Sequence, residues 1–198
     1  MNIDIVVPKN NEQEFLLMAE KLGYTAIIFF YKNKPEIKKI THEKVQVFIA
    51  CSEKTNDVDL VIHEHDQRDR EIIERQQAQL ISKLESEQRK DFIRQRASGL
   101  NHVITTLMHQ KNVSVCFSLN EIIYAQYRSQ LLGRMMQNVK LCRKDKVKMI
   151  LASLAPIPYA MRSPHDLKAL AIVLGMHPEE AKAALKNACE ICKKNNSK

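Results

Sequence analysis

Two histidines lie one residue apart in the run His63-Glu64-His65-Asp66, which directly follows an apolar stretch. Side chains at positions i and i+2 of a strand point to the same face, so both imidazoles could reach one metal ion. A metal site also needs ligands from other strand ends, and the first apolar run of the chain offers only Asp4. We therefore interpret the histidines as polar strand-end residues and expect no metal site.

Two other combinations of reactive side chains have simpler explanations than catalysis. Cys189-x-x-Cys192 lies inside a helical pattern, and no second pair completes a four-ligand zinc site. Ser163, His165 and Asp166 occur together, but this spacing caps a helix, and no G-x-S-x-G motif accompanies them. The chain has only four glycines, too widely spaced for a phosphate-binding loop. The sequence thus predicts neither a hydrolase triad nor a glycine-cradled nucleotide site.

Apolar runs of strand length alternate with helical patterns along the chain. Six runs are predicted to be buried strands: residues 3–7, 25–31, 45–51, 59–63, 113–117 and 148–152. Two further candidates are residues 78–84, which also fit a helix, and residues 158–162, which would be an eighth strand. Helices are predicted over residues 11–22, 68–76, 100–110 and 120–144, from Ser163 to Gly175, and from His177 onward.

This alternation is typical of a parallel sheet covered by helices. Eight such units predict a compact α/β fold, a TIM-barrel-like (β/α) barrel with no helix between its second and third strands. A doubly wound open sheet is the alternative. Because no linker, repeat or low-complexity stretch divides the chain, we expect a single domain over residues 1–198, with a disordered tail at 195–198.

The positive charge of the chain is concentrated in its middle. Residues 88–148 hold 12 basic and 3 acidic groups, whereas residues 1–87 hold 12 basic and 16 acidic groups. The middle segment therefore has a net charge of +9, and the whole chain has +8. Such segregation indicates a polyanionic partner, most commonly RNA or DNA, with a merely solvated basic surface as the alternative.

The expected location is the cytoplasm. The N-terminal apolar run is too short for a signal peptide, and no stretch approaches the roughly 20 apolar residues of a membrane span. The five cysteines are odd in number and fit reduced thiols. We therefore expect no membrane partner.

Arg128 stands out in the helix predicted over residues 120–144. It lies on the apolar side of the helix near the N-terminal end, where the helix dipole disfavours a cation. In a barrel this end faces the mouth, where functional groups collect. A phosphate or carboxylate partner is therefore expected for Arg128, whereas Arg143 near the C-terminal end has a favourable position in the dipole.

Four segments match a known pattern in the same order. They are R-x-S-G-L-N from Arg96 to Asn101, V-S-V-C-F-S-L-N-E-I-I after it, R-x-x-L-L-G-R-M-M-Q-N-V-K-L-C-R-K from Arg128 to Lys144, and M-R-S-P-H-D-L from Met161 to Leu167. The chain resembles ribonuclease P protein component 3, the thirty-kilodalton subunit family of archaeal and eukaryotic ribonuclease P. The resemblance covers most of residues 88–178, and the short length resembles the archaeal members.

The resemblance implies a barrel distantly similar to the polymerase-and-histidinol-phosphatase (PHP) metalloenzymes. In those enzymes an H-x-H motif on the first strand binds metal, but here that strand reads I-D-I-V-V-P-K-N-N. The missing ligands agree with the expectation of no metal and no catalytic residues in this chain. A PHP-like metal-dependent phosphoesterase that uses His63, His65 and Asp66 is the alternative function.

The resemblance also implies a non-catalytic role in transfer-RNA maturation. A protein of this family binds the catalytic ribonuclease P RNA, pairs directly with protein component 2, and supports removal of the 5′ leader from precursor tRNA. Components 1 and 4 and a kink-turn-binding ribosomal-type protein complete the archaeal holoenzyme. The family implies no cofactor in this chain, while the RNA uses Mg²⁺.

Carried onto this sequence, the resemblance supplies nine candidate RNA-binding residues. Arginine can grip phosphate oxygens with two parallel hydrogen bonds, and asparagine and serine can add neutral ones. Since aromatic residues are few in this region, we expect backbone contacts rather than base stacking, and hence binding that weakens steeply with salt. The candidates are Arg89, Lys90, Arg96, Asn101, Arg128, Arg134, Arg143, Arg162 and Ser163.

Overall fold

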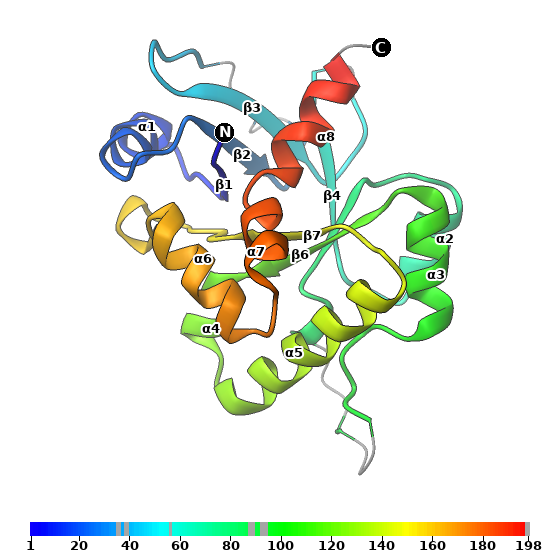
Figure 1. Ribbon diagram of the computed structural model, residues 1–198. Helices are drawn as coiled ribbons and strands as arrows, with labels where there is room; N and C mark the ends of the chain where they lie inside the picture. Colours follow the sequence, from blue (N-terminus) through cyan, green and yellow to red (C-terminus); the bar gives the residue numbers. More distant parts are fainter. Residues whose placement is uncertain (35–36, 38–39, 56, 87–89, 92–94, 197–198) are drawn as a thin grey trace.

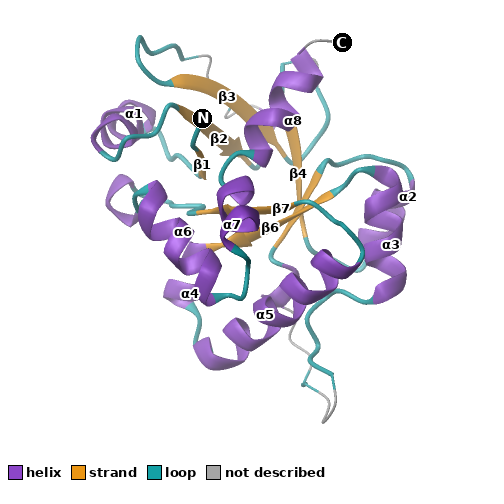
Figure 2. Cartoon of the chain, viewed as in Figure 1, coloured by secondary structure: helices purple, strands orange, loops and turns teal. Residues whose placement is uncertain are grey.

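The computed structural model describes residues 1–198 except 35–36, 38–39, 56, 87–89, 92–94 and 197–198. Seven parallel strands form one sheet, and each strand pairs with its neighbours in chain order. Figure 2 shows these strands surrounded by helices. The strands are β1 (Ile3–Val6), β2 (Ala26–Tyr31), β3 (Gln46–Cys51), β4 (Leu60–Glu64), β5 (Leu80–Ser82), β6 (Ser114–Ser118) and β7 (Met149–Ala152).

The sheet curls into a nearly closed barrel, because the segment after β7 returns to β1. The Leu154 amide donates to the carbonyl of Ile5 at 2.8 Å, and the Val7 amide donates to that of Ala155 at 2.9 Å. Val6 and Ala155 form an isolated parallel bridge. The predicted TIM-barrel-like fold is therefore confirmed, and the open sheet is excluded.

The expected eighth strand at 158–162 is wrong. Pro158–Ala160 forms a short 3-10 helix, η3, and residues 153–155 contact β1 in place of a strand. Proline lacks the N–H that a ladder requires, which explains why this apolar run does not join the sheet. The ambiguous run 78–84, by contrast, contains β5, which is paired on both sides.

Eight helices in the described residues cover the barrel (Figure 1). None has the length and apolar content needed to cross a bilayer. Between β2 and β3 the described residues contain no α-helix, and Lys34 there has a 3-10 conformation. The helices are α1 (Glu12–Lys21), α2 (Asp69–Glu74), α3 (His102–Lys111), α4 (Leu119–Tyr124), α5 (Arg128–Lys144), α6 (Pro164–Val173), α7 (Pro178–Ala184) and α8 (Asn187–Asn196). Another short 3-10 helix, η2 (Leu84–Ser86), follows β5.

Two helix predictions need correction. The predicted helix over 120–144 is interrupted, because Ala125 is extended and separates α4 from α5. The expected disordered tail begins too early, since α8 continues to Asn196 and the Asn195 side chain donates to the carbonyl of Asp59 at 2.8 Å. Residues 197 and 198 of that tail lie outside the described residues.

Helix α8 lies across the end of the barrel at which the strands begin, which we call the base. The Asn187 side chain donates to the carbonyl of Met149 at 2.8 Å, and the Ile3 amide donates to that of Leu185 at 3.1 Å. Its Cys189 and Cys192 pack with the apolar residues inside the barrel. Both thiols are buried, and neither forms a disulfide. They help to close the base, which is the structural role that the sequence pattern indicated for this motif.

Candidate nucleic-acid interface

The strongest matches to the family pattern meet at one place, where η2, Asp91 and residues 96–101 lie against α5. Arg134 of α5 is 4% exposed. Its Nε lies 2.8 Å from Asp91 Oδ1, and its Nη1 donates to the carbonyl of Glu85 at 2.9 Å. Although desolvation opposes ionisation, hydrogen bonds from Arg134 and the Ala97 amide hold the pKa of Asp91 below its usual range. The predicted RNA-binding residue Arg134 thus lies in the interior and binds its own chain.

Two neighbouring residues of α5 extend this network. Asn138 is fully buried and donates to Glu85 Oε1 at 2.7 Å and to the carbonyl of Ser98 at 2.8 Å. Gln137 accepts from the Arg96 amide and donates to the Arg96 carbonyl, both at 3.0 Å. Burial raises the pKa of Glu85 to about 7, despite the hydrogen bond from Asn138. The segment is therefore fixed to α5 through side chains that satisfy its backbone.

Two glycines lie where the two segments approach each other. Gly99 has φ +74°, and a Cβ there would lie 2.4 Å from the carbonyl oxygen of Leu84. On α5, a Cβ on Gly133 would lie 2.5 Å from the guanidinium carbon of Arg96. At Gly99 the neighbouring atom belongs to the backbone and φ is positive, so glycine is required there; at Gly133 the neighbour is the end of the flexible Arg96 side chain, which can shift.

Most of the other predicted arginines also bind their own chain. Arg96 is half-exposed, with its Nη1 3.4 Å from Asp91 Oδ2. Arg128 is exposed, yet its Nε and Nη2 each lie 2.9 Å from a carbonyl of α4. Arg143 forms a two-pronged ion pair with Glu180, with its Nε 2.8 Å from Oε1. The Arg162 Nη1 donates to the carbonyl of Met161 at 2.7 Å.

Arg128 was expected to bind a phosphate or a carboxylate, but in the structure it binds backbone carbonyls. No carboxylate in the described part of the chain pairs with Arg128, and its partners are the carbonyls of Ile122 and Ile123. These carbonyls lie at the C-terminal end of α4, where the last turn leaves acceptors unsatisfied and a cation is favourable. Arg128 lies at the unfavourable end of the dipole of its own helix, α5, but at the favourable C-terminal end of the preceding helix, α4.

The neutral candidates are helix caps. The Asn101 side chain accepts from the Ile104 amide at 2.9 Å, and the Ser163 Oγ accepts from the Asp166 amide at 3.2 Å. Lys90 is exposed, and Arg89 lies outside the described residues. Contact of these candidates with RNA stays a prediction, but the structure distributes them over several regions.

Lys90 borders a cavity of about 610 Å³ between η2 and the connection from α4 to α5. Tyr124 and Tyr127 also line it and are 66% and 68% exposed. Glu121 and the buried Glu85 contribute acidic groups. The low aromatic content of the sequence argued against base stacking, and it gave no sign that two tyrosines would be exposed beside a candidate lysine.

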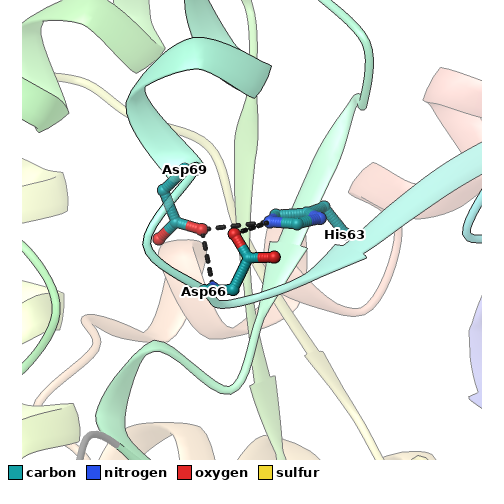
Figure 3. Close-up of side chains that lie close together, drawn as sticks. All are labelled: His63, Asp66 and Asp69. Atoms are coloured by element: carbon teal, nitrogen blue, oxygen red, sulfur yellow. Dashed lines mark hydrogen bonds and ion pairs between the residues drawn. The ribbon is translucent and has the colours of Figure 1, made fainter.

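The histidine run forms a compact cluster beside α2, shown in Figure 3. The Nε2 of His63 lies 3.1 Å from Asp69 Oδ1 and 3.3 Å from Asp66 Oδ1, and His65 Nδ1 also contacts Asp69. Although burial opposes ionisation, the hydrogen bonds from His63 and His65 hold the pKa of Asp69 well below its usual range. Asp69 was not among the candidates, because it lies on a helix rather than at a strand end.

This cluster is the one group of three possible metal ligands in the described residues. One imidazole and two carboxylates suit zinc by type, but each already has a partner within the cluster or in Arg68, which lies 2.7 Å from Asp66. The cluster is also on the outer side of the sheet, since Ile62 points into the barrel and His63 follows it.

At the mouth, where the strands end, an acidic side chain from β4 is neutralised by lysines. Glu64 lies 3.1 Å from the Nζ atoms of both Lys32 and Lys83. Burial opposes ionisation of Glu64, but the two lysines lower its pKa. Fixed cations beside this carboxylate do not suit a metal site at the mouth.

The motifs that meet at α5 also match a known protein family. The model of the family described as RNase P subunit p30 matches residues 90–198. The chain belongs to this family. The matched residues include α5 and most of the segment that packs against it, so the family-like positions and the intramolecular network coincide.

Curated relatives agree over a shorter stretch. Ribonuclease P protein component 3 of Methanococcoides burtonii is 34% identical over 92 residues, which are 46% of this chain and 38% of that protein. The protein of the same name from Thermococcus kodakarensis is 33% identical over 89 residues, which are 44% of this chain and 40% of that protein. The chain thus spans about two-fifths of the length of the curated relatives that it matches.

Solved structures show a similar fold over almost the whole chain. A chain of an archaeal ribonuclease P studied by cryo-electron microscopy with mature tRNA has a TM-score of 0.79 and 20% identity, covering 98% of this chain and 91% of that chain. A histidinol phosphate phosphatase from Lactococcus lactis, complexed with zinc, has a TM-score of 0.58 and 10% identity, covering 89% and 94%. At these identities the likeness establishes the barrel fold alone.

Proposed function

We propose that this RNase P subunit p30 family member is a protein subunit of ribonuclease P that binds the catalytic RNA and supports removal of the 5′ leader from precursor tRNA. One observation carries the proposal: the family model matches more than half of the chain. The segregated charge supports it, because 12 basic and 3 acidic groups in residues 88–148 suit a polyanionic partner.

The subunit acts electrostatically and architecturally rather than by chemistry of its own. Cations on the barrel neutralise RNA phosphates, and the condensed counterions are released. The reduced repulsion between phosphates stabilises the compact RNA. The attachment of Glu85, Asp91, Arg96 and Ser98 to α5 presents a surface of defined shape to a partner. The catalytic step belongs to the RNA with its Mg²⁺, and this chain holds no cofactor.

The proposal extends to partners and location. Protein component 2 pairs directly with the chain, and components 1 and 4 and a kink-turn-binding ribosomal-type protein complete the cytoplasmic holoenzyme. The cavity beside Lys90 is a suitable place for a protein contact, because it combines two exposed tyrosines with acidic groups, which would repel RNA.

Reconstitution tests this function. The cognate ribonuclease P RNA, a precursor tRNA and the other protein components are combined with and without this chain, and release of the 5′ leader is measured. Addition of the chain should raise the cleavage rate at moderate Mg²⁺, whereas the chain alone should cleave nothing. A rate that does not change on addition of the folded chain would refute the proposal.

The alternative is a metal-dependent phosphoesterase, and the cluster of His63, Asp66 and Asp69 is the observation that favours it. We expect dialysed chain to retain no stoichiometric zinc, because the three side chains already satisfy one another. Elemental analysis after zinc loading, with His63→Ala as the control, measures this directly. Stoichiometric zinc together with phosphoester hydrolysis, both lost in His63→Ala, would favour the alternative.

A further inference from the structure

A second cationic surface lies at the base of the barrel, far along the strands from the mouth. A cavity of about 450 Å³ opens there, where β5, β6 and β7 begin and α8 crosses them. Four lysines line it, one from the end of α3, two from the start of β7 and one from α8. They are Lys111, Lys146, Lys148 and Lys194, and we call this feature the basal lysine pocket.

The fold brings these lysines together in a simple way. Lys146 and Lys148 flank the buried Val147, so the lysines lie on the solvent side of the chain as it enters β7. Lys111 ends α3 just before β6, and Lys194 is in the last turns of α8. Because parallel strands begin at the same edge of a sheet, these separate segments converge.

The basal lysines have no acidic partner in the part of the chain that the structure describes. Within the described residues, no ion pair involves any of the four lysines, and one acidic residue, Glu190, lines the pocket with them. The rest of the lining includes the amide side chains of Gln79, Asn112 and Asn195. Uncompensated cations beside neutral hydrogen-bonding groups form a surface suited to phosphate and ribose oxygens.

The family-like arginines offer a contrast. Arg134 is buried, Arg143 pairs with Glu180, and Arg128 caps α4, so each has a partner within the chain. A cation that already binds a carboxylate loses that contact when it binds a phosphate. The basal lysines lose no such ion pair when they bind a phosphate. Their net gain in binding free energy is therefore larger, which favours the base as the stronger phosphate-binding surface.

We infer that the basal lysine pocket binds the phosphate backbone of the ribonuclease P RNA, at a surface separate from the family-like motifs. This inference rests on the proposed function. Its lysines act as mobile point charges that contact successive phosphates, while the amides donate to sugar and phosphate oxygens. Recognition there is of the backbone and not of the base sequence.

A matched pair of variants tests the inference. The pocket variant carries Lys111→Gln, Lys146→Gln, Lys148→Gln and Lys194→Gln. The control variant carries Lys21→Gln, Lys54→Gln, Lys168→Gln and Lys182→Gln, at lysines scattered over other elements. Both variants lose the same charge, so a difference between them reports the position of the lysines rather than the net charge.

The measurement is affinity for the cognate ribonuclease P RNA at several salt concentrations, with thermal unfolding to verify the fold. We expect the pocket variant to bind the RNA at least about tenfold more weakly at low salt. The plot of log binding constant against log salt concentration should also become shallower, by up to about 0.9 in slope for each lost phosphate contact. The control variant should keep most of the affinity and slope. Lysine acetylation of the wild-type complex, read by mass spectrometry, should show protection of Lys148 but not of Lys182.

The outcomes separate the inference from the function on which it rests. Equal losses in the two variants, or none, in a wild-type chain that does bind the RNA would overturn the inference alone. A pocket variant that loses thermal stability but keeps its affinity for RNA would also overturn the inference. It would show that the lysines stabilise the fold, for example at helix C-termini, where cations are favourable. Wild-type chain without affinity for the RNA would overturn both. A free polyphosphate that competes as well as RNA at equal phosphate would show a small-anion site instead.

Discussion

The interface of α5 with η2, Asp91 and residues 96–101, here called the α5 interface, and the basal lysine pocket both contain cations, but the cations have different roles in the two places. At the α5 interface the guanidinium of Arg134 is desolvated and binds Asp91 and a backbone carbonyl, so its charge stabilises the fold. At the base, Lys146 and Lys148 are exposed, and no described acidic residue forms an ion pair with them. A basic residue in a family-like motif is therefore not necessarily a ligand-binding residue, because arginine also binds backbone carbonyls of its own chain.

The largest expected effect is at Arg134. Its replacement by alanine leaves Asp91 and the Glu85 carbonyl without their partner, and should lower the free energy of unfolding by about 3 kcal/mol. Urea denaturation measures this, and Lys140→Ala, on an exposed position of the same helix, is the control. An unchanged stability combined with lost RNA affinity would instead place Arg134 in the RNA interface.

Gly99 tests the close approach of the two segments. Gly99→Ala combines a left-handed backbone with a Cβ that would lie 2.4 Å from the Leu84 oxygen, so we expect a loss of about 2–3 kcal/mol. Gly23→Ala is a matched control, since Gly23 has φ +79° but no atom within 4 Å of the added Cβ. The control should lose about 1 kcal/mol. Equal losses would show that backbone strain alone, without the contact, accounts for the glycine.

Glu85 makes the α5 interface sensitive to pH. Its pKa is raised to about 7 in the folded chain from an ordinary value of 4.5, so the folded state holds a proton that the unfolded state loses. Stability should therefore fall as pH rises from about 4.5 to 7, by up to about 1.4 kcal/mol per unit from this group.

The difference between wild type and Glu85→Gln isolates this effect from the other carboxylates. Glutamine carries no titrating proton, so the variant should gain stability relative to wild type across the same pH range. Denaturation at pH 5, 6 and 7 gives the difference. The basal lysine pocket contains no comparable buried carboxylate among its described lining residues, and the pocket variant should track wild type in this series.

The smallest expected effect is at Arg128. Arg128→Ala removes two hydrogen bonds to the end of α4 at an exposed position, and should cost about 1 kcal/mol of stability. The folded variant should still show reduced cleavage of precursor tRNA in the reconstituted enzyme if the arginine also contacts RNA. A reduction that disappears when the variant is assayed well below its melting temperature would make Arg128 purely structural.

Much of the fold could be predicted because its signals are local. Apolar runs bounded by helix starts marked six strands, and the Ser163 cap preceded α6 as expected. The break between α4 and α5 and the failure of residues 158–162 to form a strand were missed. Both depend on which partner a segment meets in the closing barrel, and periodicity within one segment carries no such information.

The candidate interface was less predictable. The segregated charge directs attention to residues 88–148, but charge along the sequence does not distinguish the buried Arg134 from the exposed cations of that segment. The basal lysine pocket had a sequence signal, since Lys111 and Lys146 stand just before predicted strands and Lys148 is the first residue of one. Strand starts share one edge of a parallel sheet, so their convergence could have been anticipated.

The sequence by itself determined the family, the succession of strands and helices, and an excess of positive charge in the middle of the chain. Only the tertiary structure decided which cations bind their own chain and which are left for a partner. The reason is physical: charge and apolar periodicity are properties of single segments, whereas the partner of a guanidinium depends on which carboxylates and carbonyls the folded barrel brings within 3 Å of it.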